Sequence, residues 1–343
     1  MGIMSSPRSS RASGRVTLQD VAREAGVSPI TASRALRGTR GVHAELVERS
    51  LAAAQRLGYV PDPAARALAS SRSTQVAVLI PLLSNTLFVD VLDAVQRSLL
   101  PAGFQTLIGV THYDAAEEEQ LLRSFLPHRP AGLLVTGFDR TETARRLIHD
   151  SGVPTVHLME LTSAPGIHSV GFSQAAAGRA LTEHLLRSGR RRIAYAAAQL
   201  DPRVLQRAEG YRQALRAAGL YDPALEWLSP APSSIELGGV LLEQGLERHP
   251  DVDAIFFCND DLAQGALLKA LRLGVAVPSR LAVAGFNDLP GSPQMLPALT
   301  TVRTRRREMG LAAADMMLAL MRGEPVAQPS VDLGFELVLR ESA

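Results

Sequence analysis

The chain has 343 residues, of which 46% are hydrophobic and 20% charged, enough for two or three domains with packed cores. The net charge of +2 is unevenly spread: residues 1–73 hold eleven arginines against five acidic residues, while the rest carries 25 basic and 29 acidic residues, so only the N-terminal part suits a polyanion partner. No run of about 18 apolar residues occurs, which excludes a membrane-spanning helix, and a single cysteine, Cys258, excludes an internal disulfide and fits a reducing cytoplasm.

Residues 1–15 are rich in serine and arginine and contain no apolar run, which excludes a signal peptide or membrane anchor. We expect a disordered tail there. Two roles stay open for it: contact with nucleic-acid phosphates, or an inert extension from a misassigned start codon.

The segment 16–37 has the pattern of two short helices joined by a tight turn. The first has an apolar face and a capping box formed by Thr17 and Asp20, and Gly26 ends it. Its apolar face consists of Leu18, Val21, Ala22 and Ala25. Ser28 and Pro29 then predict the start of a second helix, with Ala32, Ala35 and Leu36 on its inner side. We interpret this as a helix-turn-helix; a two-helix corner of any small α domain is the alternative.

The second helix presents small polar, apolar and bidentate groups outward, which suits base edges and phosphates. These groups are Ser28, Pro29, Ile30, Ser33 and Arg34. A third helix is predicted over 44–57, with Gly58 at its end and Tyr59 and Val60 packed back on it. Its core side is expected to hold Leu46, Val47, Leu51, Ala54 and Leu57. The following AARALAS segment, after Pro61, Asp62 and Pro63, is too short to be a stable helix alone.

From Gln75 onward, short apolar runs alternate with helical stretches. QVAVLIP, FQTLIGV, AGLLVTG and PTVHLME form one set of buried parallel strands, and RRIAYAAA, DAIFFC and LAVAGF form a second. This alternation predicts two doubly wound α/β lobes with ligands bound beyond the carboxyl ends of the strands. No catalytic constellation is found, and no cofactor or metal is expected. Asp260 and Asp261 fit the first turn of a helix, and Cys258 fits the core.

The motif VxxxAGVSxxTxSRxL, followed by LGYVPD and PAARALASSRS, resembles the headpiece of the LacI/GalR family of bacterial repressors. IPLLSNTLF, GLLVTG, FCNDDLAQGAL, LAVAGFND and LTTVR resemble the effector-binding core of the family, in the family's order. VPTVHLME, SVGFS and VDLGFELVLR are most similar to the subgroup of gluconate-operon repressors.

The resemblance implies an all-α helix-turn-helix headpiece and a two-lobed core like the periplasmic binding proteins. The expected organisation is a tail at 1–15, a DNA-binding domain at 16–61, a hinge at 62–73 and an effector-binding and dimerisation domain at 74–343. In the family the hinge orders on the operator and inserts a leucine into the minor groove, here Leu68; Asp62 departs from the family's asparagine. The DNA-binding residues are expected to be Thr17, Leu18, Ser28, Pro29, Ile30, Thr31, Ser33, Arg34, Tyr59 and Leu68. The crossings between lobes are placed near Phe172, near Thr301 and late in a helix at 306–321.

For the effector site, the resemblance points to Arg207, Asn259, Asn85 and Phe88. Two acids of the relatives that bind neutral sugars are replaced here by Asn287 and Met159, and Arg306 is expected at the rim. Since an unpaired carboxylate would repel an anion, their loss favours a sugar acid such as gluconate or keto-gluconate. A Glu160 side chain turned inward would weaken that argument.

The expected partners are palindromic operator DNA, a small sugar-acid effector and a second copy of the chain, because one recognition helix reads only a few base pairs. No heptad tail follows the last strand-like run, 335–339, so a coiled-coil tetramer is not expected. Three alternatives stay open: a regulator that responds to a neutral sugar or a purine, a periplasmic-type sugar-binding protein, and a carbohydrate enzyme with an appended headpiece.

Overall fold

The computed structural model describes residues 16–38, 41–60 and 73–343. The chain divides into two compact units, Met1–Ser73 and Thr74–Ala343. The expected tail at 1–15 and most of the expected hinge, including Leu68, lie outside the described residues. Within the described ranges, no helix is long and apolar enough to cross a membrane.

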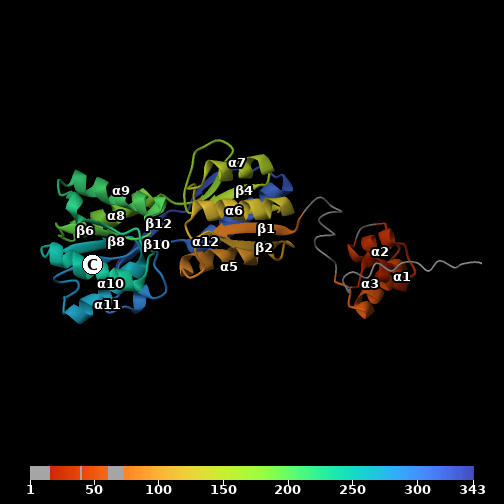
Figure 1. Cartoon of the computed structure of the whole chain (residues 1–343), viewed down its shortest axis with the longest axis horizontal. Coiled ribbons are helices and arrows are strands. Elements are labelled where there is room, and N and C mark those ends of the chain that lie inside the picture. Colours follow the sequence, from red (N-terminus) through yellow and green to blue (C-terminus); the bar gives the residue numbers. More distant parts are fainter. Residues whose placement is uncertain (1–15, 39–40, 61–72) are drawn as a thin grey trace, which may run out of the picture. The chain divides into compact units, whose positions relative to one another are not determined.

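The first unit consists of three helices, α1 (Leu18–Ala25), α2 (Pro29–Leu36) and α3 (Ala44–Leu57), drawn in red and orange in Figure 1. The predicted capping box is confirmed: the Thr17 side chain accepts from the Asp20 N–H, and the Asp20 side chain accepts from the Thr17 N–H. Gly26 ends α1 in the left-handed conformation, and the Ser28 hydroxyl caps α2. The helix-turn-helix predicted from the sequence is therefore present.

The core side of α3 differs from the prediction. Leu51 is 51% exposed and Val60 is 80% exposed, so neither is a core residue. The buried residues of α3 are Ser50, Ala53 and Ala54, of which only Ala54 was predicted, and the predicted Leu57 packs against the same cluster. These small side chains let α3 approach α1 and α2 closely, and Tyr59 covers the cluster as predicted.

The first lobe of the second unit is built on a six-stranded parallel sheet in the order β11-β5-β4-β3-β1-β2. Its strands are β1 (Gln75–Ile80), β2 (Gln105–Val110), β3 (Gly132–Thr136), β4 (Thr155–Leu158), β5 (His168–Gly171) and β11 (Ser330–Asp332). Its helices are α5 (Thr86–Leu99), α6 (Ala115–Phe125), α7 (Glu142–Ser151) and α12 (Arg306–Arg322), with the short 3-10 helix η1 (Leu126–His128) after α6.

Helices cover both faces of this sheet, which explains the unbroken apolar run of β1. Val76, Val78 and Ile80 belong to the same buried cluster as α5 and α12, whereas Ala77 and Leu79 pack with residues of α6 and α7. Strand β2 was expected to be buried, but most of it is partly or fully exposed. The reason is its place at the edge of the sheet, where it has one neighbouring strand instead of two.

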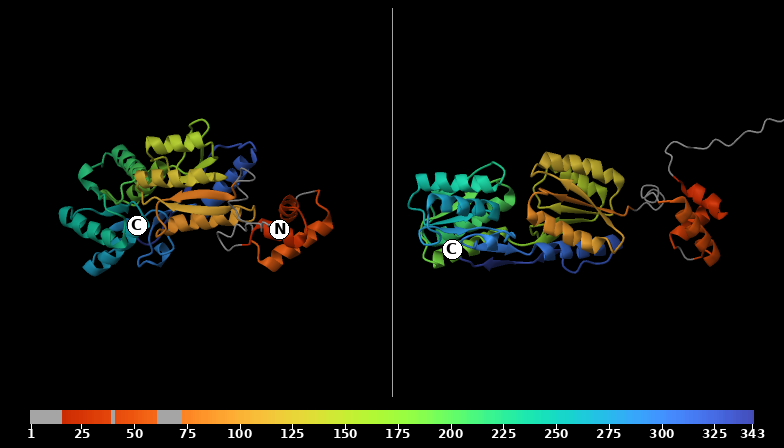
Figure 2. Two further views of the ribbon diagram at one scale, coloured as in Figure 1. Left: turned by 45° about the vertical axis from the view of Figure 1, so that its right-hand side comes forward. Right: turned by 90° about the horizontal axis from the view of Figure 1, so that it is seen from below.

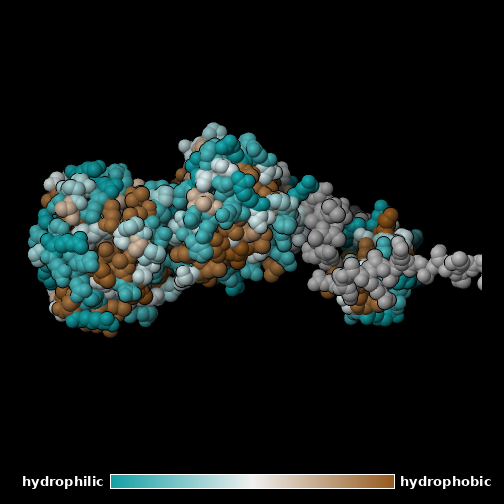
Figure 3. All heavy atoms as spheres, in the orientation of Figure 1, coloured by the Kyte–Doolittle hydropathy of each residue, from teal (hydrophilic) through white to brown (hydrophobic). Residues whose placement is uncertain are grey.

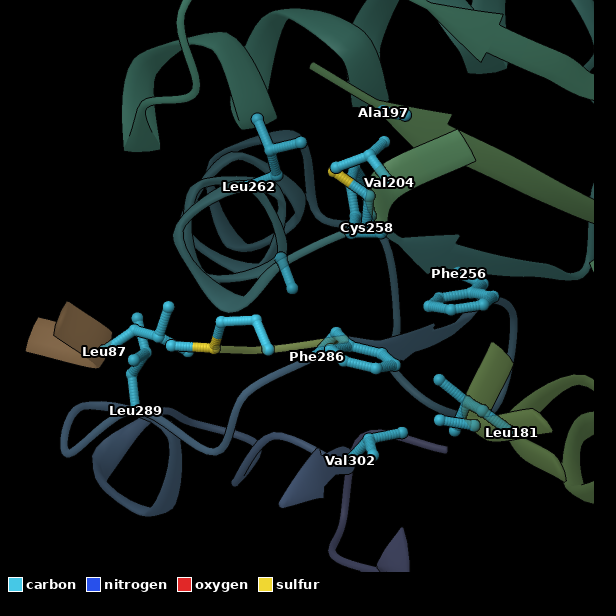
Figure 4. Close-up of a cluster of buried hydrophobic side chains, with 14 of the residues drawn as sticks. Leu87, Leu181, Ala197, Val204, Phe256, Cys258, Leu262, Phe286, Leu289 and Val302 are labelled. Atoms are coloured by element: carbon cyan, nitrogen blue, oxygen red, sulfur yellow. The ribbon is translucent and has the colours of Figure 1, made fainter. Parts of the chain in front are cut away.

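The second lobe has a four-stranded parallel sheet in the order β7-β6-β8-β9. Its strands are β6 (Ile193–Ala197), β7 (Glu226–Leu228), β8 (Ala254–Phe257) and β9 (Ala282–Ala284). Its helices are α8 (Gln174–Arg187), α9 (Pro202–Ala217), α10 (Ile235–Arg248) and α11 (Asp260–Leu273), with 3-10 helices η2 (Pro223–Leu225) and η3 (Ser292–Gln294). Phe256 and Phe286 stack at 6.4 Å between centroids in its core, and Cys258 is buried there as predicted (Figure 4).

The chain passes between the lobes three times. The first crossing follows β5 near Phe172, and the second lies between β10 (Thr301–Thr304) and α12, both as expected. The third was expected late in α12, but this is wrong: α12 stays on the first lobe and β11 joins the first sheet. The crossing therefore follows β11 and leads into β12 (Phe335–Val338), which pairs antiparallel with β10 (Figure 2).

One close helix contact gives a stability prediction. A Cβ atom on Gly265 of α11 would lie 1.7 Å from the Ile235 carbonyl oxygen of α10. A Cβ atom on Gly239 would meet nothing closer than 3.4 Å. We expect Gly265→Ala to destabilise the core by about 1–3 kcal/mol through overpacking, and Gly239→Ala to be neutral or stabilising by up to about 1 kcal/mol because alanine favours the helix. Urea unfolding of both variants measures this, and equal losses would contradict the contact.

Candidate functional site

The outward face of α2 carries four exposed residues that the sequence assigned to DNA. Ser28, Pro29 and Arg34 are exposed, and Ile30 is 65% exposed, although it is apolar. Ala32 and Ala35 hold the opposite face against the small core. An exposed α2 of this kind has the dimensions and side chains that fit the major groove.

The remaining residues assigned to DNA have mixed positions. Thr17 is exposed but holds the capping box, and Leu18 is half-buried. Thr31 and Ser33 are half-buried on α2, where the Thr31 hydroxyl lies 2.8 Å from the Ser28 hydroxyl. Tyr59 packs against the helical core.

A cavity of about 260 Å³ lies between the two lobes of the second unit. Loops that follow strands at their carboxyl ends form its wall: Ser84 after β1, Met159 after β4, Gln199 after β6 and Asn259 after β8. This is the position where doubly wound sheets hold ligands. The residues predicted for the effector that line this cavity are Asn85, Phe88, Met159, Arg207, Asn259 and Asn287.

Arg306 does not line the cavity, contrary to the expectation. Its Nε forms an ion pair with Asp90 of α5 at 2.8 Å, and its Nη1 donates to the carbonyl oxygens of Asn287 and Asp288. The Asp90 carboxylate binds the Arg306 guanidinium because α12 begins beside α5. Arg306 thus joins the first lobe to a loop of the second.

Two predicted asparagines are fixed in place because each caps a helix. Asn85 accepts from the Leu87 N–H at the start of α5, and its Nδ2 donates to Asp261 across the cavity at 3.2 Å. Asn259 accepts from the Leu262 N–H at the start of α11, and its Nδ2 donates to Ser233 at 2.8 Å. Each side chain therefore has little freedom to turn away from the cavity wall.

Arg207 is buried in the cavity wall without a carboxylate partner. Its Nε donates to Gln174 at 2.8 Å, its Nη1 donates to the Cys258 carbonyl at 2.6 Å, and its guanidinium carbon lies 3.9 Å from the Phe286 ring centroid. Among the described residues, no acidic side chain forms an ion pair with Arg207, and its Nη2 makes no hydrogen bond. A buried cation is costly unless an anion compensates it.

Asn287 also lines the cavity and carries an unsatisfied polar atom. Its Oδ1 is buried and has no hydrogen-bond partner in the described part of the chain. Its backbone φ of 112° lies in the region that favours glycine, and the Arg306 contact with its carbonyl helps to hold it there. Strained backbone of this kind persists where the surrounding structure fixes it, often at ligand sites.

Arg203, a cavity-lining residue that the sequence interpretation missed, binds three carboxylates. Its Nε lies 2.9 Å from Asp201, and its Nη1 lies 3.0 Å from Asp139 and 3.3 Å from Glu160. Burial lowers the pKa of Arg203, but the negative charges of Asp201 and Asp139 raise it by a larger amount. The net shift of the pKa is therefore upward, and the guanidinium stays charged. Asp139 and Glu160 belong to the first lobe and Arg203 to the second, so this cluster joins the lobes.

Glu160 does not line the cavity. Besides Arg203, it accepts from Gln206 at 2.6 Å. Two other acids, Asp201 and Asp261, do line it, and neither was predicted as a site residue. Burial and the neighbouring Asp260 both raise the pKa of Asp261, which disfavours a second negative charge there.

Asp260 does more than complement the helix dipole of α11. It is fully buried and accepts from the Leu289 N–H, the Ser292 hydroxyl and the Thr301 hydroxyl at 2.6–2.7 Å. It therefore ties α11 to the segments around β10. Over residues 16–38, 41–60 and 73–343, no group of three or more His, Cys, Asp or Glu side chains is arranged to hold a metal ion.

Comparison with known proteins gives two matching family models. The model described as "Bacterial regulatory proteins, lacI family" matches residues 17–62, and the "Periplasmic binding protein-like domain" matches residues 182–343. The HTH-type transcriptional regulator GntR of Pseudomonas aeruginosa is 56% identical over 342 residues, covering 100% of both chains.

Solved structures agree with this match. The transcription regulator GntR from Chromobacterium violaceum has a TM-score of 0.77 and 50% identity, covering 78% of this chain and 98% of that one. The lac repressor dimer bound to operator and the anti-inducer ONPF has a TM-score of 0.84 and 25% identity, covering 96% and 99%. The fold predicted for both parts of the chain is therefore confirmed.

The Arg203 cluster gives a prediction about stability. Arg203→Met leaves buried carboxylates unpaired, and we expect a loss of about 3–5 kcal/mol in the unfolding free energy of the core. Arg97→Met is the matched control, because Arg97 pairs with Asp93 on the surface of α5 with both side chains well exposed. Chemical denaturation of both variants should show a large loss for the first and no measurable change for the second. Similar values for the two would show that the buried cluster contributes no more than a surface pair.

Proposed function

Because the chain belongs to the lacI family of bacterial regulatory proteins, we propose that a sugar acid, such as gluconate or a keto-gluconate, controls its affinity for DNA from the interlobe cavity. The chain is a DNA-binding transcriptional regulator and not an enzyme. The observation that carries the effector proposal is the buried, uncompensated guanidinium of Arg207 in the cavity wall.

An anionic effector suits three features of this cavity. Arg207 has a free Nη2 to donate to a carboxylate, and the Asn287 amide can meet hydroxyl groups along the chain of a sugar acid. The N-cap residues of four helices line the cavity, namely Asn85, Asp201, Ser234 and Asn259. Helix N-termini carry partial positive charge, which favours an anion.

The acids in the cavity wall do not cancel this preference. Asp201 is held by Arg203 at 2.9 Å, and Asp261 accepts a hydrogen bond from Asn85 Nδ2 at 3.2 Å. Asp261 nevertheless supports the rival candidate, a neutral sugar, since carboxylates accept from sugar hydroxyls. A purine is the third candidate.

The DNA-binding role of the first unit rests on α2. We propose that residues 16–61 bind the operator, that 62–73 form the hinge and that 74–343 bind effector and dimerise. A homodimer would place two copies of α2 on the half-sites of a palindrome. Apolar residues gather on both lobes of the second unit (Figure 3), where Val89, Leu268 and Leu271 are among the exposed ones, and such surfaces suit a second copy.

The mechanism is a linkage between two sites. Effector binding changes the relative position of the lobes, alters the spacing of the paired hinges and so changes the free energy of operator binding. By reciprocity, the operator changes effector affinity by the same factor. Leu68 enters this mechanism as the proposed minor-groove wedge.

Arg34 tests the DNA-binding face. If its side chain reads a base, Arg34→Ala should weaken specific binding by about 1–3 kcal/mol, whereas loss of a phosphate contact would weaken all sequences alike. Arg56→Ala is the control, because Arg56 lies on α3 and pairs with Glu24. Fluorescence anisotropy on specific and random duplexes separates the outcomes, and an Arg34→Ala protein that binds as the unaltered protein does would remove α2 from the interface.

The effector proposal is tested by anisotropy of the full chain on the palindromic DNA upstream of its own operon, with gluconate, keto-gluconate, glucose and a purine. We expect a change in DNA affinity with a sugar acid alone. Arg207→Gln should keep DNA binding but weaken the sugar-acid response at least about 30-fold, because it removes a buried charge-assisted contact. Arg216→Gln, an exposed arginine on the same helix α9, is the matched control.

Three results would contradict parts of the proposal. A response to glucose or the purine alone would replace the sugar acid with that ligand. Equal effects of Arg207→Gln and Arg216→Gln would remove Arg207 from the site. No specific DNA binding at all would contradict the assignment of residues 16–61.

A further inference from the structure

A second cavity, of about 510 Å³, lies in the first lobe and shares no lining residue with the interlobe cavity. It is formed by α7, by the segments leading into β4 and β5, and by Leu320 near the end of α12. Its volume lies within the range of pockets that hold small organic ligands. We call it the α7 cavity.

The walls of the α7 cavity combine apolar side chains with basic ones. The apolar residues are Phe138, Ile148, Val153, Pro154, Ile167 and Leu320. Two arginines and three histidines also line it, together with Gly152, Thr155 and Gly166, and no lining residue is acidic. A cavity with this composition is complementary to a negatively charged ligand with an apolar body.

His157 on β4 is one of two buried polar residues in this lining, the other being Arg140. Its Nδ1 lies 3.0 Å from the Gly137 carbonyl oxygen, and its ring stacks on Phe138 at 4.4 Å between centroids. Its Nε2 makes no hydrogen bond within the described residues. Burial and the nearby charge of Arg140 lower the pKa of His157 to about 4, with the Gly137 contact opposing them, so the imidazole is neutral at pH 7. His157 and Phe138 therefore present two stacked, uncharged rings to the cavity.

The basic groups at the rim of the α7 cavity form only exposed ion pairs. Arg145 pairs with Glu142 at 3.1 Å and His149 with Asp150 at 2.9 Å, but all four side chains are more than half exposed. Exposed pairs of this kind contribute little and exchange readily with other anions. Arg140, in contrast, is buried and forms an ion pair with Glu118 at 2.6 Å. It therefore adds positive electrostatic potential to the cavity but no free hydrogen-bond donor at the rim.

We propose that the α7 cavity binds a small aromatic carboxylate, with the ring against the apolar wall beside Phe138 and His157 and the carboxylate at the rim near Arg145 and His149. The charge of the lining selects the anion, and the paired rings select a flat apolar body. This site is separate from the proposed sugar-acid site, so either can fail without the other.

The test uses the full chain and 2-naphthoate as the probe, with binding followed by isothermal titration calorimetry. We expect saturable binding of one ligand per chain with a Kd of about 1 mM or tighter, from the usual affinity per ligand atom. The neutral analogue 2-naphthalenemethanol should bind more weakly, because it lacks the charge that the rim recognises.

Two arginines on α7 give a matched pair of variants. Arg145 and Arg146 both pair with Glu142, but only Arg145 lines the cavity. Arg145→Gln should weaken 2-naphthoate binding roughly threefold to tenfold, while Arg146→Gln should leave it unchanged. Ile167→Trp fills the cavity and should abolish binding in protein whose circular dichroism matches that of the unaltered chain.

Three results would overturn the proposal. They are the absence of saturable binding at about 5 mM probe, well above the expected Kd; equal effects of the two arginine variants; and unchanged binding by folded Ile167→Trp protein. Equal affinity for the acid and the alcohol would overturn its anionic part. Arg145 and Arg146 are both exposed, so both glutamine variants should fold. The comparison of these two variants therefore tests the proposal even if Ile167→Trp does not fold.

Discussion

The core is organised around one buried cation, Arg203, and the carboxylates that surround it. Two of these carboxylates come from loops of the first lobe, and the arginine comes from the first turn of α9 in the second. Leaving one of these buried charges without its partner is costly, which favours the arrangement of the lobes in which the pairing is complete. Gly137 shows how tightly the cluster is packed: a Cβ atom there would lie 2.1 Å from Arg203 Nη1. Arg203 and Asp201 of this cluster also form part of the wall of the interlobe cavity.

The cavity wall is made from residues with two roles. Asn85, Asp201 and Asn259 satisfy backbone N–H groups at helix starts, and the same residues face the space where a ligand would sit. This follows from the doubly wound fold, in which helices start where strands end. The same residue can therefore cap a helix and contact a ligand. The sequence alone could not show which of these roles such a residue has.

The sequence predicted what depends on local pattern and missed what depends on distant packing. The bounds of α3 agree with the prediction because its apolar periodicity and its end signal, Gly58, are strong. Strands β5, β7 and β11 were not predicted because polar or charged residues interrupt their short apolar runs, whereas the equally short β8 and β9 are wholly apolar. In the cavity, the predicted Arg207 and Asn259 matched family motifs, whereas Arg203 and Asp261 were not singled out by any motif. Arg306 was placed wrongly because only the packing of α12 on α5 brings Asp90 beside it.

The three passages of the chain between the lobes also bear on how the protein is made. Strands β6 to β9 of the second lobe come from one continuous stretch, 193–284, which leaves the ribosome as a unit. The first lobe cannot be completed until α12 and β11 have been synthesised, because β11 must pair with β5 across about 160 residues of intervening chain. Nascent chains therefore expose the unfinished edge of the first sheet while the four-stranded sheet of the second lobe can already form, and an exposed sheet edge needs protection from wrong pairing during synthesis.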